Sequence, residues 1–440
     1  MKEILLFVPG IFGSKLCAPD GEEVWPPTPR EVLMGYKRID RLLGELQPNG
    51  VVETVCIDVY GKVVRALEEL GYTTDGTERR LIAYGYDWRR DLLSLADELD
   101  ATLTGLRDEH GPDTAIKLVC HSMGGLLARA CLERPRAAAR PWTEQVTLAV
   151  FLATPHQGAP LAFARAIGVG GSSMGVSERD LCRLAAATGY PTGYQLFSSV
   201  ALEPIWNLGS ATPLAPVSLF DPILVAPWNL TQANLDAARA LQVALDPNRR
   251  PKTCRYFAIA SAAHETVTRF NMDLSDLAPV KVEASGDGTV PVTSAAALPI
   301  QTAFVEANHM GVPQKEATHR LLGMLLGRKK PGPVIAATGV VSRPTLSLNE
   351  RLVERNVPVE IVVATPPRDR LVAKIRIERE GKGSALVEVA VLRVEAAATK
   401  LTRLALKSPP LEVGRHVFTL LIDGVPADEE ELLVTGAPRD

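Results

Sequence analysis

The chain of 440 residues lacks long apolar runs and a marked excess of charge of either sign. Its most apolar loop stretch, residues 214–230, is interrupted by one aspartate and three prolines, so no membrane-spanning helix is expected. A net charge of −3 gives no basic surface, which argues against nucleic acid as a partner. Residues 1–8 are too short for a signal peptide and have no small-residue cleavage site after them. A cytoplasmic protein is therefore expected.

Cysteine is also scarce, with six residues in the whole chain. Several of them stand in expected strands and helices, where cysteine behaves as a small apolar residue. No pair has the short spacing of a zinc site. We therefore expect a reduced protein without structural metal, and no cofactor is predicted.

Residues 115–131 are the stretch around which the chain is organised. An apolar run that predicts a buried strand stops at His121-Ser122, and an apolar pattern at helical spacing follows directly. This order predicts a nucleophile elbow with Ser122 at its apex, where small flanking residues let strand and helix approach closely. Gly124 meets that need, whereas Cys120 stands two positions before the serine, where the usual pattern has glycine.

The first expected strand, Glu3–Val8, runs into the glycine-containing loop Pro9–Ser14. Backbone N–H groups of such a loop can turn toward a neighbouring site. An oxyanion hole in this kind of fold takes one N–H from this loop and one from the residue after the nucleophile. The corresponding residues are Phe12 and Met123. A plain glycine turn is the alternative.

Strands and helices alternate along the first three quarters of the chain, which predicts a doubly wound α/β fold with a mostly parallel sheet, as in α/β-hydrolases. Right-handed crossovers are expected between its strands. Further strands are expected at residues 81–84, 146–152, 255–260, 280–284 and 301–306, and helices at residues 59–70, 92–110 and 312–326.

Two segments depart from this alternation. Residues 17–50 have little regular pattern and an exposed-looking Trp25, which fits either a mobile lid or a solvated excursion. Residues 161–250 are predicted to form a cap over the site. Its apolar residues, among them Trp206 and Trp228, either line an acyl pocket, touch a bilayer surface or pack on the core.

A change of pattern after residue 327 predicts a second domain. Residues 1–327 are expected to form the catalytic domain, residues 328–334 a linker rich in proline and basic residues, and residues 335–440 an all-β sandwich. Strands with turns between them are expected at residues 358–363, 371–377, 385–394 and 416–422, with Asp423-Gly424 as a hairpin turn after the last.

A serine nucleophile needs a base and an acid that orients the base. In α/β-hydrolases these follow in the order Ser, Asp, His, in loops after strands. Ser122, Asp287 and His309 satisfy that order. His264 is the best rival base but precedes Asp287, and His156, in a loop near the site, is expected to contact the pocket or lie behind it.

Several motifs together resemble the lecithin:cholesterol acyltransferase family, which includes lysosomal phospholipases and phospholipid:diacylglycerol acyltransferases. The resemblance spans about residues 1–327 and rests on Pro9–Ser14, Tyr86–Arg89, His121–Gly125, Thr154–Pro160, Tyr194–Leu196 and Gly286–Pro291. It implies a serine acyl enzyme acting on lipid esters, with Ser122, Asp287 and His309 as triad and Phe12 and Met123 as oxyanion donors. By the same resemblance, Trp25 would lie on a lid that contacts lipid.

The chain departs from the family pattern at Cys120, in the missing secretion signal and in the added C-terminal region. The short lid disulfide of secreted members has no obvious counterpart, since Cys17 and Cys56 are further apart. The lipoprotein role and the sterol acceptor are therefore not expected.

These features predict a hydrolase of lipid carboxylic esters, of phospholipase A or lipase type, that works through an acyl-serine intermediate. The alternatives are a lipid O-acyltransferase with a bound alcohol acceptor and a non-catalytic scaffold of hydrolase fold. Expected partners are a lipid ester, transiently a membrane surface, and possible protein partners of the C-terminal sandwich.

Overall fold

A computed structural model of the protein describes residues 2–209, 215–221, 228–273, 276–327, 344–365, 370–380, 387–395 and 402–436. The expected linker, residues 328–334, lies outside these ranges, so the domain division stays a prediction. Within them, no helix has the length and apolar character needed to span a bilayer.

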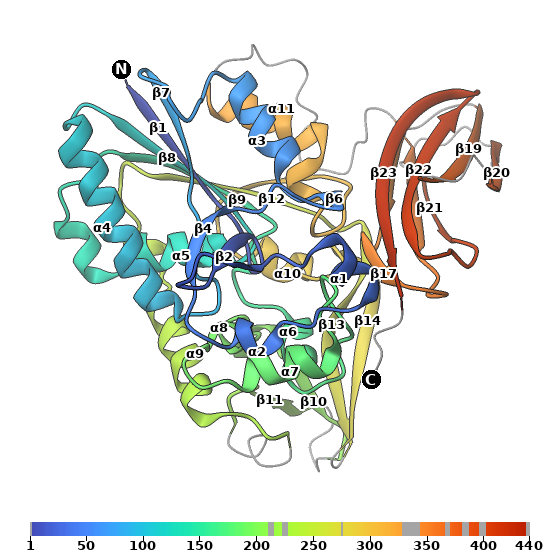
Figure 1. Cartoon of the computed structure of the whole chain (residues 1–440), viewed down its shortest axis with the longest axis horizontal. Helices are drawn as coiled ribbons and strands as arrows, with labels where there is room; N and C mark the ends of the chain where they lie inside the picture. Colours follow the sequence, from blue (N-terminus) through green and yellow to red (C-terminus); the bar gives the residue numbers. More distant parts are fainter. Residues whose placement is uncertain are drawn as a thin grey trace.

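The central feature is a six-stranded sheet in the order β15-β12-β9-β8-β1-β7 (Figure 1). All five neighbouring pairs run parallel, so the carboxyl ends of the strands meet at one edge. The predicted α/β architecture with a mostly parallel sheet is confirmed. The strands are β1 (Glu3–Val8), β7 (Arg79–Ala83), β8 (Ala115–His121), β9 (Val146–Leu152), β12 (Arg255–Ala260) and β15 (Gln301–Phe304).

Helices cover both faces of this sheet (Figure 1). Helix α3 (Gly61–Glu69) contacts α11 (Glu316–Leu325) on one side, and α4 (Leu92–His110) contacts α5 (Met123–Leu132) on the other. Asp91 caps α4 by accepting a hydrogen bond from the Ser94 N–H. The leucines that α4 carries at helical spacing are buried, because the sheet covers that side of the helix.

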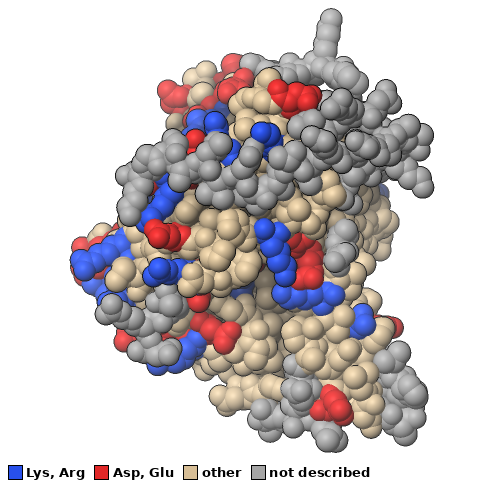
Figure 2. All heavy atoms as spheres, turned by 90° about the vertical axis from the view of Figure 1, so that its right-hand side faces the viewer, with Lys and Arg blue, Asp and Glu red and all other residues tan. Residues whose placement is uncertain are grey.

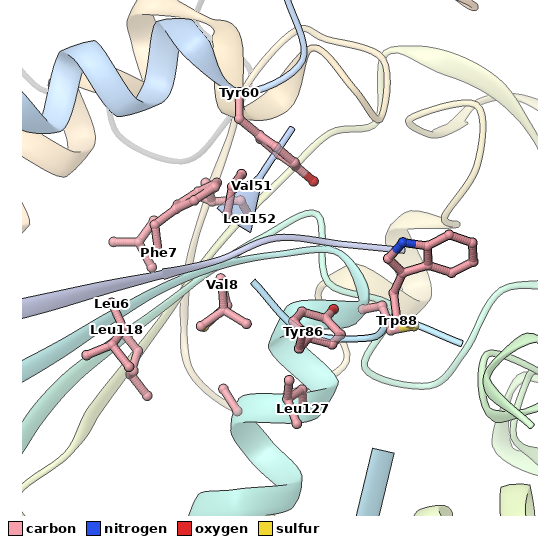
Figure 3. Packing of buried hydrophobic residues seen from close by; sticks show 14 of the residues in the cluster. Leu6, Phe7, Val8, Val51, Tyr60, Tyr86, Trp88, Leu118, Leu127 and Leu152 are labelled. Atoms are coloured by element: carbon pink, nitrogen blue, oxygen red, sulfur yellow. The ribbon is translucent and has the colours of Figure 1, made fainter. Parts of the chain in front are cut away.

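Alternation along β1 places side chains in both layers of the core. Phe7 packs edge-on against Tyr60, with ring centroids 5.1 Å apart, while Val8 points to the opposite side, toward Tyr86 and Leu127 (Figure 3). All of them are buried. Side chains on both faces of the sheet thus fix the end of β1, which positions the loop that follows it.

Two expected elements differ from the structure. Residues 280–284 do not continue the central sheet, because they belong to β14 (Asp276–Gly286), which pairs antiparallel with β13 (His264–Asp273) in a separate sheet. The helix expected over residues 312–326 is divided into a 3-10 turn, Val312–Gln314, and α11, since Pro313 has no N–H to donate in a continuous helix.

Residues 17–50 are more regular than the sequence predicts. Antiparallel strands frame the segment, and α1 begins with a capping box between Thr28 and Glu31. Trp25 is fully buried, so the expected exposure of this side chain is wrong. The elements are β2 (Ser14–Cys17), β3 (Glu23–Trp25), α1 (Pro29–Met34), α2 (Ile39–Leu42) and β4 (Gln47–Val51).

The segment expected to be a cap forms short helices around a hydrophobic cluster that β13 completes; the cluster includes Phe163, Phe197 and, from β13, Phe270. Residues 210–214 and 222–227 of this segment lie outside the described part. Its main helices are α6 (Pro160–Ala166), α7 (Glu178–Ala186), α8 (Thr192–Gln195) and α9 (Gln232–Ala244).

The C-terminal region forms two further sheets, β16-β18-β21 and β17-β23-β22-β19-β20 (Figure 1). Side chains of both sheets meet in one hydrophobic cluster, an arrangement consistent with the predicted sandwich. Their strands are β16 (Thr345–Leu348), β17 (Leu352–Glu354), β18 (Glu360–Thr365), β19 (Arg370–Arg379), β20 (Val387–Glu395), β21 (Thr402–Lys407), β22 (Gly414–Ile422) and β23 (Val425–Thr435).

The turn between β22 and β23 follows the sequence prediction. Asp423 and Gly424 have φ angles of 51° and 84°, the positive values that a two-residue hairpin turn requires. On the face of the molecule that these sheets occupy, basic and acidic side chains are interspersed among the described residues (Figure 2). The described residues on this face therefore form no extended patch of one sign (Figure 2).

Candidate active site

The elbow at Ser122 has the strained geometry that its sequence predicts. Ser122, with φ 51° and ψ −124°, lies between the end of β8 and the start of α5. Its N–H donates to the Leu152 carbonyl of β9 at 2.8 Å. A Cβ atom on Gly124 would lie 2.5 Å from the Val8 carbonyl oxygen and therefore clash with β1. Glycine is thus required there, whereas Cys120 is accommodated inside the buried strand.

Three side chains predicted from chain order meet at this turn. Ser122 Oγ lies 2.9 Å from His309 Nε2, and His309 Nδ1 lies 2.8 Å from Asp287 Oδ2. Asp287 is buried, and the side chain of His309 is 13% exposed. The carboxylate fixes Nδ1 as the protonated nitrogen, which leaves Nε2 free to accept the serine proton.

A tight turn after β14 holds the Asp287 carboxylate. Its Oδ1 accepts hydrogen bonds from the N–H groups of Thr289, at 2.9 Å, and Val290, at 2.7 Å. The backbone N–H of His309 donates to the Asp287 carbonyl at 2.8 Å. Asp287 therefore contacts the histidine loop twice, although β14 does not belong to the central sheet as expected.

The two expected oxyanion donors flank the serine. Met123 is the first residue of α5, where a backbone N–H has no acceptor within the helix. Phe12 adopts a φ of 65°, and Gly10 is close enough that a Cβ atom there would lie 2.9 Å from Ser122 Cβ. In the described part of the chain neither N–H has a protein acceptor. Both can therefore serve a substrate oxygen.

A chain of hydrogen bonds links the loop that contains Gly10 to the loop that contains His309. No sequence motif predicted this chain. The Gly10 N–H donates to Tyr60 Oη at 3.0 Å, and the Tyr60 hydroxyl donates to His121 Nδ1 at 2.7 Å. His121 Nε2 then donates to the His309 carbonyl at 3.1 Å. Burial, with the neighbouring His309 as a second cause, holds the pKa of His121 well below its usual value. The ring is thus neutral and has one tautomer.

For a reaction at Ser122, we expect Tyr60→Phe to lower kcat about 10-fold while KM changes little. The substitution leaves the Gly10 N–H and His121 Nδ1 without their partner, which also costs about 1–3 kcal/mol of stability. Steady-state kinetics and urea unfolding measure both effects.

Tyr72→Phe is the matched control, because Tyr72 Oη bonds Glu3 Oε2 at 2.7 Å, away from the serine. It should lose stability but keep kcat. An unchanged kcat in Tyr60→Phe would show that the chain is only structural.

A cavity opens in front of Ser122 and His309. Its walls come from the oxyanion loop, the cap and the C-terminal region, and most of its lining is apolar. The apolar lining includes Ile11, Phe12, Ile57, Val59, Leu161, Ala162, Met174, Leu181, Leu184, Leu196, Val290, Met310 and Leu352. Such a surface fits a hydrocarbon chain and excludes water from the serine.

The other residues expected at the pocket lie behind or beside it. Trp25 contacts Phe12, with ring centroids 4.9 Å apart, and donates from Nε1 to the Phe12 carbonyl at 2.8 Å. It therefore supports the oxyanion loop and does not line the cavity. Trp206 packs on Arg269, and Trp228 packs on the cap cluster. Neither lines the cavity.

Two histidines are set apart from the triad. His156 is buried against Phe151, outside the cavity lining, and burial followed by the charge of Arg129 holds its pKa well below the usual value. His264 Nε2 bonds Ser347 Oγ at 2.6 Å, so this ring faces the C-terminal region. This geometry does not support His264 as the alternative base. No three His, Cys, Asp or Glu side chains of the described ranges are grouped to hold a metal ion.

The C-terminal region also contacts the loops of the site, which the sequence did not reveal. Asn308 Nδ2, next to the histidine, donates to the Leu348 carbonyl at 2.7 Å, and Asn308 Oδ1 accepts from the Gly311 N–H at 2.7 Å. A Cβ atom on Gly288 would lie 3.0 Å from the Asn349 carbonyl oxygen. Strand β16 and the residues after it thus pack against both the aspartate and the histidine loops.

Comparison with known proteins agrees with the motif pattern. Residues 46–178 match the lecithin:cholesterol acyltransferase family, a range that contains Ser122 but ends before Asp287 and His309. The resemblance to that family is confirmed over this range. A comparison with curated proteins gives no match.

Two solved structures are similar at low identity. The product of gene lin2722 from Listeria innocua is 12% identical, with 75% of this chain and 96% of that chain covered and a TM-score of 0.34. Phospholipase PlaB from Legionella pneumophila is 11% identical, with 98% of this chain and 88% of that chain covered and a TM-score of 0.32.

Proposed function

We propose that this chain, whose residues 46–178 match the lecithin:cholesterol acyltransferase family, is a serine hydrolase of lipid carboxylic esters of phospholipase A or lipase type. The observation that carries the proposal is the hydrogen-bonded series Ser122, His309, Asp287 beside an apolar cavity. A hydroxyl, an imidazole and a carboxylate in this order are what acyl transfer by serine requires.

In the first half of the reaction, Ser122 Oγ attacks the ester carbonyl carbon and transfers its proton to His309 Nε2. The oxyanion that forms accepts hydrogen bonds from the N–H groups of Phe12 and Met123. When this intermediate collapses, the bond to the alcohol oxygen breaks and that oxygen takes the proton from His309. An acyl-Ser122 ester remains in the apolar cavity.

In the second half, water attacks the acyl carbon and gives a proton to His309 Nε2. Collapse releases the fatty acid, and Ser122 regains its proton from His309. Asp287 stays ionised throughout and stabilises the imidazolium. The phospholipase A or lipase assignment rests on the apolar lining, which suits a fatty acyl chain.

Acyl transfer to an alcohol is the second candidate, and the match of residues 46–178 to an acyltransferase family favours it. The first half of the reaction is the same. An alcohol then replaces water, and the product is a new ester.

Covalent labelling tests the proposed nucleophile. We expect a fluorophosphonate to modify the wild-type protein on the peptide that contains Ser122, as located by mass spectrometry. The exposed Ser94→Ala variant, altered far from the site, should label equally. Labelling absent even in detergent micelles, with the fold intact, would favour the non-catalytic scaffold.

Product analysis separates the two candidates. We expect free fatty acid from a dioleoyl phospholipid in mixed micelles without any acceptor. If fatty acid is absent and a new ester forms only after a long-chain alcohol is added, the chain is an acyltransferase.

A further inference from the structure

Four arginine and glutamate side chains line the mostly apolar cavity, and they fall into two pairs. Arg89 is held by Asp87, at 2.8 and 2.7 Å, and by backbone carbonyls. Arg351 donates to the Asp58 carbonyl at 3.0 Å and lies near carboxylates of β23. Both of these guanidinium groups are engaged by protein.

Arg165 and Glu350 differ from them. Both line the cavity that contains Ser122 and His309. In the described part of the chain, neither side chain makes a hydrogen bond or ion pair, and Arg165 Nε is buried without a partner. Glu350 is exposed to solvent. A site with a free cation and a free anion can accept both ends of a dipolar ligand.

The surroundings of Arg165 make its charge costly unless a ligand engages it, and Glu350 lies close enough to interact with that charge. Burial lowers the pKa of Arg165, and Glu350 opposes that effect. Partial burial raises the pKa of the Glu350 carboxyl, and the charge of Arg165 opposes the shift. Each group therefore feels the other's charge. A charged group with a buried atom that lacks a hydrogen bond, as at Arg165 Nε, is unfavourable, so it marks a ligand site.

The two residues come from distant parts of the chain. Arg165 lies on α6, in the segment expected to be a cap, whereas Glu350 follows β16 in the C-terminal region. The neighbouring bond from Asn308 to the Leu348 carbonyl fixes this stretch beside the triad. The C-terminal region thus contributes a charged group directly to the cavity.

We propose that Arg165 and Glu350 form a polar subsite that selects the headgroup of the lipid ester. Arg165 binds an anionic phosphodiester oxygen, and Glu350 accepts from, or attracts, a cationic group at the end of the same headgroup. Such a subsite predicts preference for a zwitterionic headgroup over an anionic or uncharged one. The substrate preference rests on the proposed function, because it requires ester hydrolysis. Binding of the headgroup to the subsite does not depend on that reaction.

The kinetic test compares three esters with the same dioleoyl chains in Triton mixed micelles: a phosphatidylcholine, a phosphatidylglycerol and an uncharged diacylglycerol. We expect Arg165→Gln to lower kcat/KM about 10- to 100-fold for both phospholipids, the loss of one charge-assisted hydrogen bond, and to spare the diacylglycerol. Arg165→Lys should recover part of the loss. Glu350→Gln should lower kcat/KM about 10-fold for phosphatidylcholine only.

Matched controls are Arg179→Gln on the exposed side of α7 and Glu45→Gln, both outside the cavity. Each control variant should leave the ranking of the three esters by kcat/KM unchanged. Equal loss on all three esters in Arg165→Gln would overturn the proposal, since it would indicate a structural role. Unchanged kinetics in both cavity variants would overturn it as well.

Binding separates this proposal from the hydrolase itself. Monomeric hexadecylphosphocholine, which has no carboxylic ester, should bind the wild type by calorimetry and bind Arg165→Gln and Glu350→Gln about 10-fold more weakly. If that holds while no ester is cleaved, the subsite stands and the proposed hydrolase fails. If esters are cleaved, but both variants bind hexadecylphosphocholine as the wild type does and keep the wild-type ranking of kcat/KM for the three esters, the hydrolase stands and the subsite fails.

Discussion

Ser122→Ala is expected to lower kcat for ester hydrolysis about 10⁶-fold, with the fold intact. The substitution removes the oxygen that lies 2.9 Å from His309 Nε2, so no acyl-enzyme can form. His309→Ala should cost about as much, because the three groups act as a unit. Fatty-acid release from mixed micelles, followed by mass spectrometry, measures the loss.

Asp287→Asn sharpens this test. An amide at this position keeps the size of the side chain but favours the wrong histidine tautomer, so we expect a loss of about 10⁴-fold. Ser94→Ala should retain full activity. If Ser122→Ala kept more than a tenth of the wild-type rate, another nucleophile would have to be sought and the proposed mechanism would be wrong.

The second large effect concerns the attachment of the C-terminal region. Lys315, which precedes α11, lies mostly buried between α11 and the C-terminal sheets, with 13% of its side chain exposed. Its Nζ lies 2.8 Å from the Leu346 carbonyl oxygen, 3.2 Å from Asp428 Oδ2 and 2.5 Å from Glu430 Oε1. Burial by itself would lower the pKa of Lys315, but attraction from Glu430 and Asp428 outweighs it and raises the pKa.

Lys315→Met is expected to destabilise the protein by about 3–5 kcal/mol, because it removes the cation closest to the largely covered carboxylates of Asp428 and Glu430. Urea unfolding followed by circular dichroism measures the change. All five tryptophans lie within residues 1–228, so fluorescence reports on the first part of the chain alone. If the C-terminal sheets separate first, the two probes will no longer coincide.

Lys252→Met, at an exposed position, is the control and should change stability by less than about 0.5 kcal/mol. Adding Glu430→Gln to Lys315→Met should restore part of the loss, since it removes one of the two negative charges that Lys315 neutralises. A loss below about 1 kcal/mol in Lys315→Met would mean that water solvates the carboxylates and that this contact contributes little.

Local sequence signals were sufficient to predict several strands of the central sheet. The strands at Glu3–Val8, Val146–Leu152 and Arg255–Ala260 have the predicted bounds, because each is an apolar run ended by turn residues. The strand–turn–helix pattern of the elbow is also local, although the need for glycine at position 124 comes from contact with Val8 of the distant strand β1. Chain order then indicated which aspartate and histidine meet this serine.

Other features depend on contacts between distant segments. The burial of Trp25 against Phe12 and Trp88 could not be predicted, because its surroundings in sequence are polar and rich in proline. The strand at residues 280–284 has the same apolar pattern whether it joins the central sheet or a hairpin, and its pairing with β13 places it in the hairpin.

The sequence by itself indicated the parallel sheet, the strand–turn–helix at Ser122 and the meeting of Ser122 with Asp287 and His309, since these depend on short-range patterns and on chain order. The tertiary structure alone decided how Tyr60 and His121 link two loops, and how the C-terminal region brings Glu350 to the cavity that Arg165 also lines. Residues 165 and 350 are far apart in the chain. Their meeting depends on how separately formed layers pack, which no local pattern encodes.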